Sequence, residues 1–296
     1  VELALSDREE IPVSIQSDEM TVTMDEAFPR VISYEKNGKT LPGGQQKAYG
    51  VKLNGTLNYP VVTCEKTGED ALSYSLLFPT LGVTLKLQYA VQGSQLRMDV
   101  TDVLETGSFQ VQTIEFENSA LISTQGGDAD ASFASLRNPG GWYELEDFIY
   151  DDLSEIPEDQ MARAYRSYGM LSSNGLAATI NNSGIETFER LNSSVIPTKE
   201  GNVASLGDGL LTVRTPLDLQ EGTKRLPWSI VLVCEDYNSD GEVNWQDAAA
   251  AHKTIRTEVK GMETMKDNMM WIAMNFASQA QTTFPSSLDL GKTIYN

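Results

Sequence analysis

The stretch that decides the fold class is GVTLKLQYAVQGSQLRMDV, residues 82–100. Its apolar residues recur at every second position: Val83, Leu85, Leu87, Tyr89 and Val91, then Leu96, Met98 and Val100. This period places them on one face of an extended chain and is typical of antiparallel strands with one packed face. The QGS turn at 92–94 separates the two runs. The stretch therefore predicts two neighbouring strands.

The same pattern extends over most of the chain. MTVTM places Met20, Val22 and Met24 on one face. Turn signals recur at KNGK 36–39, PGG 42–44, SNG 173–175 and NSG 182–184. Many short strands with few helical patterns predict a mainly β protein built as a large β-sandwich. No short repeat is visible, which disfavours a propeller.

Charge narrows the range of partners. The chain has 296 residues with 42 acidic and 22 basic side chains, a formal net charge of -20. Nucleic acid and anionic membranes would repel such a surface, so we expect neither as a partner. No apolar run approaches the roughly 20 residues that span a bilayer. Metal cations and neutral sugars remain as candidate ligands. Because the chain begins at Val1 without a signal peptide, we expect a piece of a longer protein.

Two cysteines end strand-like runs, Cys64 in VVTC and Cys234 in SIVLVC. The favoured interpretation is two buried thiols, while a disulfide between them stays open. Two cysteines rule out a four-thiolate zinc site, and there is no CxxC motif.

An acidic segment, EDYNSDGEVNWQDAAAAH at 235–252, follows the second of these runs. Counted from Asp236, oxygen-bearing side chains stand at positions 1, 3, 5 and 12: Asp236, Asn238, Asp240 and Asp247. Glycine is at position 6, and position 7, Glu242, would offer its backbone carbonyl. This is the spacing of an EF-hand-like calcium loop, so we expect Ca²⁺ as a structural ion. The alternative is a solvated acidic turn that caps a helix.

A helix follows this segment in our interpretation. Trp245, Ala248, Ala249, His252 and Ile255 have helical spacing, and Gly261 can end the helix. Residues 262–270 look helical again, and WIAMNF at 271–276 has the pattern of a short buried strand.

An aromatic and acidic segment at 138–160 interrupts the strand pattern and is interpreted as a long loop. Trp142 and Tyr143, with Phe148 and Tyr150 nearby, could stack on sugar rings. The alternative is a surface excursion held by its own aromatic residues.

Catalytic motifs are missing from the sequence. His252 is the single histidine, which disfavours a Ser–His–Asp set and chemistry that needs paired histidines. The paired glycines lack the context of a phosphate-binding loop. We assign no catalytic residue.

Three segments resemble glycoside hydrolase family 101, the endo-α-N-acetylgalactosaminidases that release core O-glycans from mucin-type glycoproteins. They are FPRVISYEKNGKTLPGG at 28–44, SIVLVCEDYNSDGEVNWQDAAAAH at 229–252 and MMWIAMNFASQAQTTFP at 269–285. The resemblance implies a galactose-mutarotase-like β-supersandwich at 1–234, a calcium loop and junction helix at 235–260, and the start of a truncated (β/α)8 barrel at 261–296. WIAMNF would be the first barrel strand.

The resemblance also implies a bacterial protein that acts outside the cell or on its surface. The family's catalytic carboxylates lie on later barrel strands, which this chain lacks. We therefore expect a non-catalytic scaffold that contacts a catalytic barrel and meets O-glycan through the parent enzyme. The alternatives are an independent carbohydrate-binding module that uses Trp142 and a mutarotase-like enzyme, which the single histidine disfavours.

Overall fold

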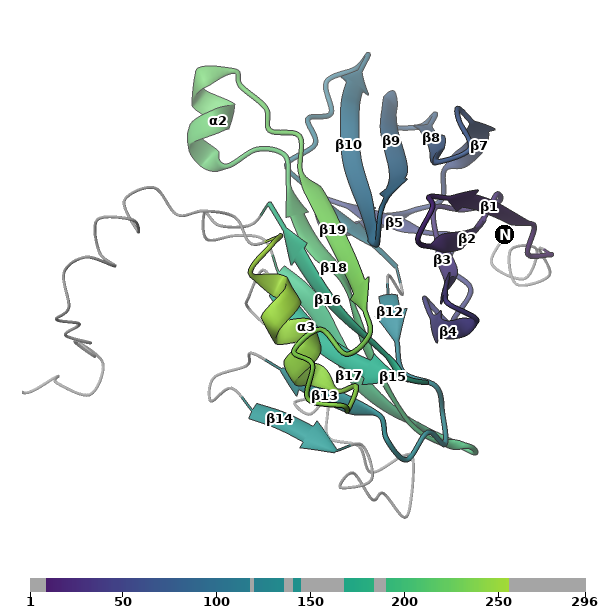
Figure 1. Ribbon diagram of the computed structural model, residues 1–296. Coiled ribbons are helices and arrows are strands. Elements are labelled where there is room, and N and C mark those ends of the chain that lie inside the picture. Colours follow the sequence, from purple (N-terminus) through teal and green to yellow (C-terminus); the bar gives the residue numbers. More distant parts are fainter. Residues whose placement is uncertain (1–8, 118–119, 136–140, 145–167, 184–189, 256–296) are drawn as a thin grey trace, which may run out of the picture. The chain divides into compact units, whose positions relative to one another are not determined.

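The computed structural model describes residues 9–117, 120–135, 141–144, 168–183 and 190–255 (Figure 1). The chain divides into two compact units, Val1–Thr257 and Glu258–Asn296. All described residues belong to the first unit. The predictions for 262–270 and for WIAMNF fall outside the described residues, as do Phe148 and Tyr150.

The first unit is built from three antiparallel sheets. The N-terminal sheet has the order β1-β2-β3-β4, and its strands are Pro12–Gln16, Thr21–Asp25, Val31–Lys36 and Lys39–Pro42. A six-stranded sheet has the order β12-β18-β11-β5-β6, and β17 also pairs with β18. Its strands are Val51–Leu53 (β5), Thr56–Asn58 (β6), Thr113–Phe116 (β11), Ala120–Ser123 (β12), Arg190–Thr198 (β17) and Gly201–Thr212 (β18).

The largest sheet has nine strands in the order β14-β13-β15-β16-β19-β10-β9-β8-β7. They are Val61–Lys66 (β7), Ala71–Phe78 (β8), Val83–Gln92 (β9), Gln95–Glu105 (β10), Ser132–Ser135 (β13), Gly141–Glu144 (β14), Tyr168–Ser173 (β15), Leu176–Asn182 (β16) and Trp228–Cys234 (β19). Two short helices complete the described part, Pro216–Glu221 (α2) and Trp245–His252 (α3). Neither is long and apolar enough to cross a membrane.

The strand pattern of residues 82–100 is confirmed in β9 and β10. The predicted inward residues of both strands are buried, and the two strands pair through Gln92 and Gln95 across a turn. Gly93 there has φ 53°, a left-handed conformation that glycine adopts without steric cost. Asn37 and Gly38 make the β3–β4 turn with φ 51° and 73°, as a tight hairpin requires.

Most of the buried apolar side chains form one core to which all three sheets contribute. Edge-on aromatic contacts join separate segments within it: Phe28, between β2 and β3, meets Phe116 of β11 with ring centroids 6.4 Å apart, and Tyr74 of β8 meets Tyr89 of β9 at 5.7 Å. Successive side chains of β16 and β19 face opposite sides of the sheet, and those that face away from the main core form a second apolar cluster. Ala178 and Val231 face the main core, whereas Ala177 and Leu232 belong to a smaller cluster with Ala248 and Ala251 of α3. Figure 1 shows α3 lying against these strands.

Three local predictions need correction. Residues 138–160 are not one long loop, because 141–144 form β14, which pairs with β13. α3 ends at His252, well before Gly261. Directly after the helix, the Ile255 N–H donates to the His252 carbonyl in a tighter turn. Cys234 is buried as predicted, but Cys64 on β7 is only half-buried because its strand is the edge of the sheet. Neither cysteine is in a disulfide.

Candidate functional site

The acidic loop begins where β19 ends, and residues distant in sequence hold its first turn. Glu235 accepts hydrogen bonds from Lys39 Nζ at 2.9 Å and Asn37 Nδ2 at 2.6 Å. Both partners belong to the β3–β4 hairpin. Their hydrogen bonds lower the pKa of the Glu235 carboxyl, Lys39 contributing most. The hairpin of the N-terminal sheet thus fixes the point from which the loop departs.

Side-chain oxygens turn the loop back on itself. The Asp236 carboxylate accepts the backbone N–H groups of Asp240 and Gly241, each at 3.0 Å. Asn238 Oδ1 accepts the Asp240 N–H at 3.0 Å, and Asp240 Oδ1 accepts the Glu242 N–H at 3.0 Å. Asp236, Asn238, Asp240 and Glu242 are all exposed to solvent.

Glycine is needed at the sixth position of the loop. Gly241 has φ 92°, in the left-handed region that favours glycine. Its N–H points to the Asp236 carboxylate. The sharp turn expected from the sequence is therefore present.

Asp247 joins the loop to the helix. Its side chain is fully buried, and Asp247 Oδ1 accepts the Asn238 N–H at 3.0 Å. Asp247 Oδ2 accepts the Asn244 N–H at 2.9 Å, which completes a capping box at the start of α3. The residue at loop position 12 is thus also the third residue of the helix. The helix cap raised as the alternative by the sequence is therefore present, and calcium binding by the same loop stays a prediction.

α3 is fastened to the nine-stranded sheet at both ends. At its start, Trp245 N–H donates to Ser132 Oγ at 3.0 Å. At its end, His252 Nδ1 lies 2.7 Å from Thr179 Oγ. Since the Thr179 hydroxyl donates to the Gly169 carbonyl, His252 Nδ1 must carry the proton and donate to Thr179. The single histidine is therefore buried in a structural contact.

Burial also sets the pKa of the Cys234 thiol, at the end of β19 just before the loop. Desolvation, with the nearby Asp247 carboxylate as a smaller cause, raises the pKa of Cys234 to about 12. The thiol therefore stays protonated at neutral pH and is a poor metal ligand. The site offers oxygen donors only.

Oxygen donors of this kind suit a hard cation such as Ca²⁺. The predicted ligands within these twelve residues are the carboxylates of Asp236, Asp240 and Asp247, the amide oxygen of Asn238 and the backbone carbonyl of Glu242. Each carboxylate that accepts an N–H keeps further lone pairs for a metal. Among the described residues, no three His, Cys, Asp or Glu side chains converge as a metal cluster. Binding would therefore require Asp236, Asp240 and Asp247 to draw closer together.

The second group of predicted site residues lies elsewhere. Trp142 and Tyr143 are on β14, at one edge of the nine-stranded sheet, opposite Ala134 and Phe133 of β13. The structure describes the backbone of this strand, and the predicted sugar contact stays a prediction. Sequence reasoning missed Asn37, Lys39 and Ser132, which hold the junction, because nothing in their local sequence links them to it.

Comparison with known proteins identifies the domain. Residues 15–245 match the family model described as galactose mutarotase-like fold domain. The chain belongs to this family. The predicted fold class, a mainly β galactose-mutarotase-like sandwich, is confirmed.

The last part of the chain matches a second family. Residues 246–296 fit the model described as endo-alpha-N-acetylgalactosaminidase. A protein of Renibacterium salmoninarum named "Putative endo-alpha-N-acetylgalactosaminidase" is 27% identical over 298 residues, which cover 94% of this chain and 19% of that protein. The relationship to glycoside hydrolase family 101 is thus confirmed, and the chain spans about a fifth of its relative. The change between the two matched regions falls in the first turn of α3.

Solved structures of similar fold are more distant. The Slr1438 protein from Synechocystis sp. PCC 6803 is 11% identical with a TM-score of 0.44, and the match covers 77% of this chain and 97% of that one. A "Putative aldose 1-epimerase" from Escherichia coli K12 is 7% identical with a TM-score of 0.44, covering 77% and 100%. The GH36 α-galactosidase AgaA variant A355E from Geobacillus stearothermophilus is 9% identical with a TM-score of 0.39, covering 76% and 41%.

Proposed function

We propose that this chain is the non-catalytic β-sandwich portion of a glycoside hydrolase that releases core O-glycans, and that Ca²⁺ bound in loop 236–247 fixes the junction that follows it. The observation that carries the proposal is the double role of Asp247. This buried carboxylate holds both the loop and the start of α3, where the match passes from one family to the other. An ion bound there would stiffen the connection.

Calcium would be held by the side chains of Asp236, Asn238, Asp240 and Asp247 and by the Glu242 carbonyl. When bound, the ion neutralises carboxylates that otherwise repel each other across a short loop. Four of these five residues are exposed, so the site is open to solvent. An open, single loop suits the weak calcium affinities of extracellular modules, roughly 10⁻⁴–10⁻³ M. Such affinities are compatible with our proposal that the parent enzyme acts outside the cell or on its surface.

The position of the histidine argues against the mutarotase-like alternative. His252 donates to Thr179 beneath α3, so it is held in a packed contact. Acid–base chemistry on a sugar ring needs a group that can reach the substrate. In our proposal the parent enzyme contacts its O-glycan substrate through its catalytic barrel, and the sandwich supports that barrel.

The proposal can be tested with a galactosyl-N-acetylgalactosamine substrate linked to a chromophore. We expect no turnover by this chain and cleavage by the longer protein that contains the barrel. Turnover by this chain would contradict the scaffold role.

Titration of this chain with free galactosyl-N-acetylgalactosamine tests the competing binding-module function. The proposal predicts no saturable binding. Saturable binding that is lost in Trp142→Ala would favour a carbohydrate-binding module instead. Trp228→Ala, on a strand distant from β14 in the sheet order, serves as the tryptophan control.

A further inference from the structure

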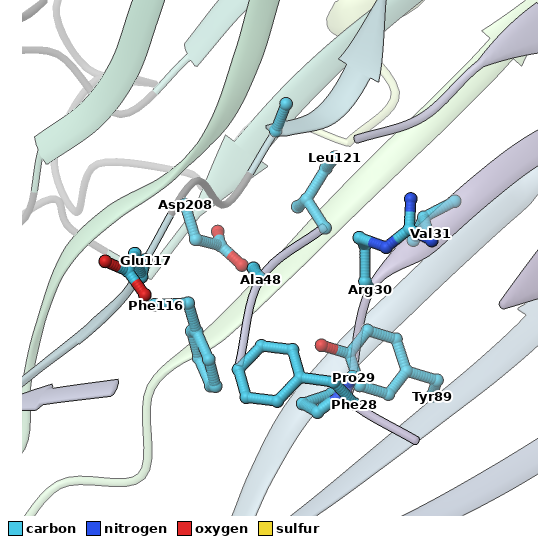
Figure 2. Close-up of a pocket in the computed structure, with 11 residues that line it drawn as sticks. Phe28, Pro29, Arg30, Val31, Ala48, Tyr89, Phe116, Glu117, Leu121 and Asp208 are labelled. Carbon is cyan, nitrogen blue, oxygen red and sulfur yellow. The ribbon is translucent and has the colours of Figure 1, made fainter. Parts of the chain in front are cut away.

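A small hollow lies where the three sheets meet, on the far side of the nine-stranded sheet from α3. Its lining includes Arg30 just before β3, Tyr89 on β9, Phe116 at the end of β11 and Asp208 on β18 (Figure 2). Its size corresponds to about one water molecule. This region, which we call the three-sheet hollow, plays no part in the proposed calcium junction.

Arg30 is a buried cation with an incomplete set of partners. Its side chain is only 6% exposed. Nη1 donates to the Gly44 carbonyl at 2.6 Å, and Nη2 pairs with Glu10 and lies 3.6 Å from Asp25. Arg30 Nε has no hydrogen-bond partner among the described residues. A buried N–H without an acceptor is rare in folded proteins, because its desolvation is not compensated.

Two other buried polar side chains line the same hollow, together with the partly exposed Glu117. Tyr89 and Asp208 are both 2% exposed, and the Asp208 carboxylate accepts a hydrogen bond from Ser229 Oγ. Figure 2 shows this carboxylate directed towards Ala48. The Tyr89 ring lies on the other side of the hollow, near Arg30. Burial, and to a lesser degree the Asp208 carboxylate, raises the pKa of the Tyr89 hydroxyl. The hydroxyl therefore keeps its proton and can donate or accept a hydrogen bond.

We propose that one ordered water molecule occupies the three-sheet hollow, accepts a hydrogen bond from Arg30 Nε, and bonds the Tyr89 hydroxyl and the Asp208 carboxylate. Such a water needs two to four polar partners, and the hollow offers three. It would link Arg30 just before β3, Tyr89 on β9 and Asp208 on β18. These three strands belong to three different sheets. The water would thus tie the three sheets together by hydrogen bonds within an apolar core.

A crystal structure of this chain at about 1.5 Å resolution tests the proposal directly, because ordered waters are well defined there. We expect a water within hydrogen-bond distance of Arg30 Nε and of at least one of Tyr89 and Asp208. An empty hollow, or an Arg30 Nε satisfied by a protein oxygen, would overturn the proposal.

Solution measurements give an independent test. Magnetic relaxation dispersion of water oxygen counts buried waters with long residence times. Ala48 lines the hollow and is 3% exposed, so Ala48→Val should fill it and lower the count by one. Ala131→Val, at a similarly buried alanine that does not line the hollow, is the matched control and should leave the count unchanged. An equal count in wild type and Ala48→Val would refute the proposal, and if Ala48→Val does not fold, the crystal structure decides.

Discussion

Asp247→Asn tests the double role of the buried carboxylate without changing the size of the side chain. Asp247 accepts two backbone N–H groups, at 3.0 Å from Asn238 and 2.9 Å from Asn244. An asparagine amide has one oxygen, so its NH2 group must face one of these donors. Hydrogen bonds to charged groups contribute about 1.5–3 kcal/mol each, and we expect a loss of about 2–3 kcal/mol in the free energy of unfolding. At about 2–4 °C per kcal/mol for a domain of this size, the Tm should fall by roughly 5–10 °C.

The assay is thermal unfolding followed by circular dichroism, in buffer that contains excess chelator so that no calcium contributes. Asp240→Asn is the matched control, because Asp240 is exposed and water can replace its partners. We expect its Tm in chelator to stay within roughly 2 °C of wild type. Equal Tm values for wild type and Asp247→Asn in chelator would refute the structural role of this side chain.

Three further predictions follow from the sheets and from the hairpin that holds the junction. Burial raises the pKa of Asp208 to about 6, so the folded state binds a proton more tightly than the unfolded state, and stability should fall as pH rises from about 4 to 6. Asp208→Asn should therefore be more stable than wild type at pH 7, by up to roughly 3 kcal/mol, and nearly equal at pH 4; urea unfolding at both pH values checks this, and the same difference at both would contradict it. Leu85→Ala in the core should cost about 2–5 kcal/mol in urea unfolding, whereas Leu77→Ala, 42% exposed, should cost under about 0.5 kcal/mol, and similar losses would argue against the observed strand faces. The half-exposed pair of Lys39 and Glu235 should contribute less than about 1 kcal/mol in a double-mutant cycle of Lys39→Met and Glu235→Gln, and a larger coupling energy would show that the hairpin holds the loop more firmly than its exposure suggests.

The strands were predictable because their signal is local. An apolar residue at every second position of β9 and β10 must face one side of the sheet, and a packed core is the only place that favours such a face. The signal for the acidic loop was equally local, since Asp236, Gly241 and Asp247 all lie within twelve residues of sequence. Its spacing predicted both the turn and the link to the helix.

The remaining contacts depend on tertiary structure. Lys39 and Glu235 lie 196 residues apart in the sequence, and no pattern near either one indicates the other. Asp208 is a charged residue between two glycines in SLGDGLL, and nothing in this stretch indicates that it is buried; its burial follows from the pairing of β18 with its neighbours. β14 was missed because its four residues are embedded in an acidic segment whose composition resembles a loop.

Calorimetric titration of the chelator-treated chain with CaCl2 tests the proposed calcium junction most directly. We expect saturable binding of one ion per chain, and saturation should also raise the Tm by mass action. Asp240→Asn should weaken this binding while its Tm in chelator stays near that of wild type. Absence of binding heat together with an unchanged Tm at 10 mM Ca²⁺ would show that the loop holds no calcium.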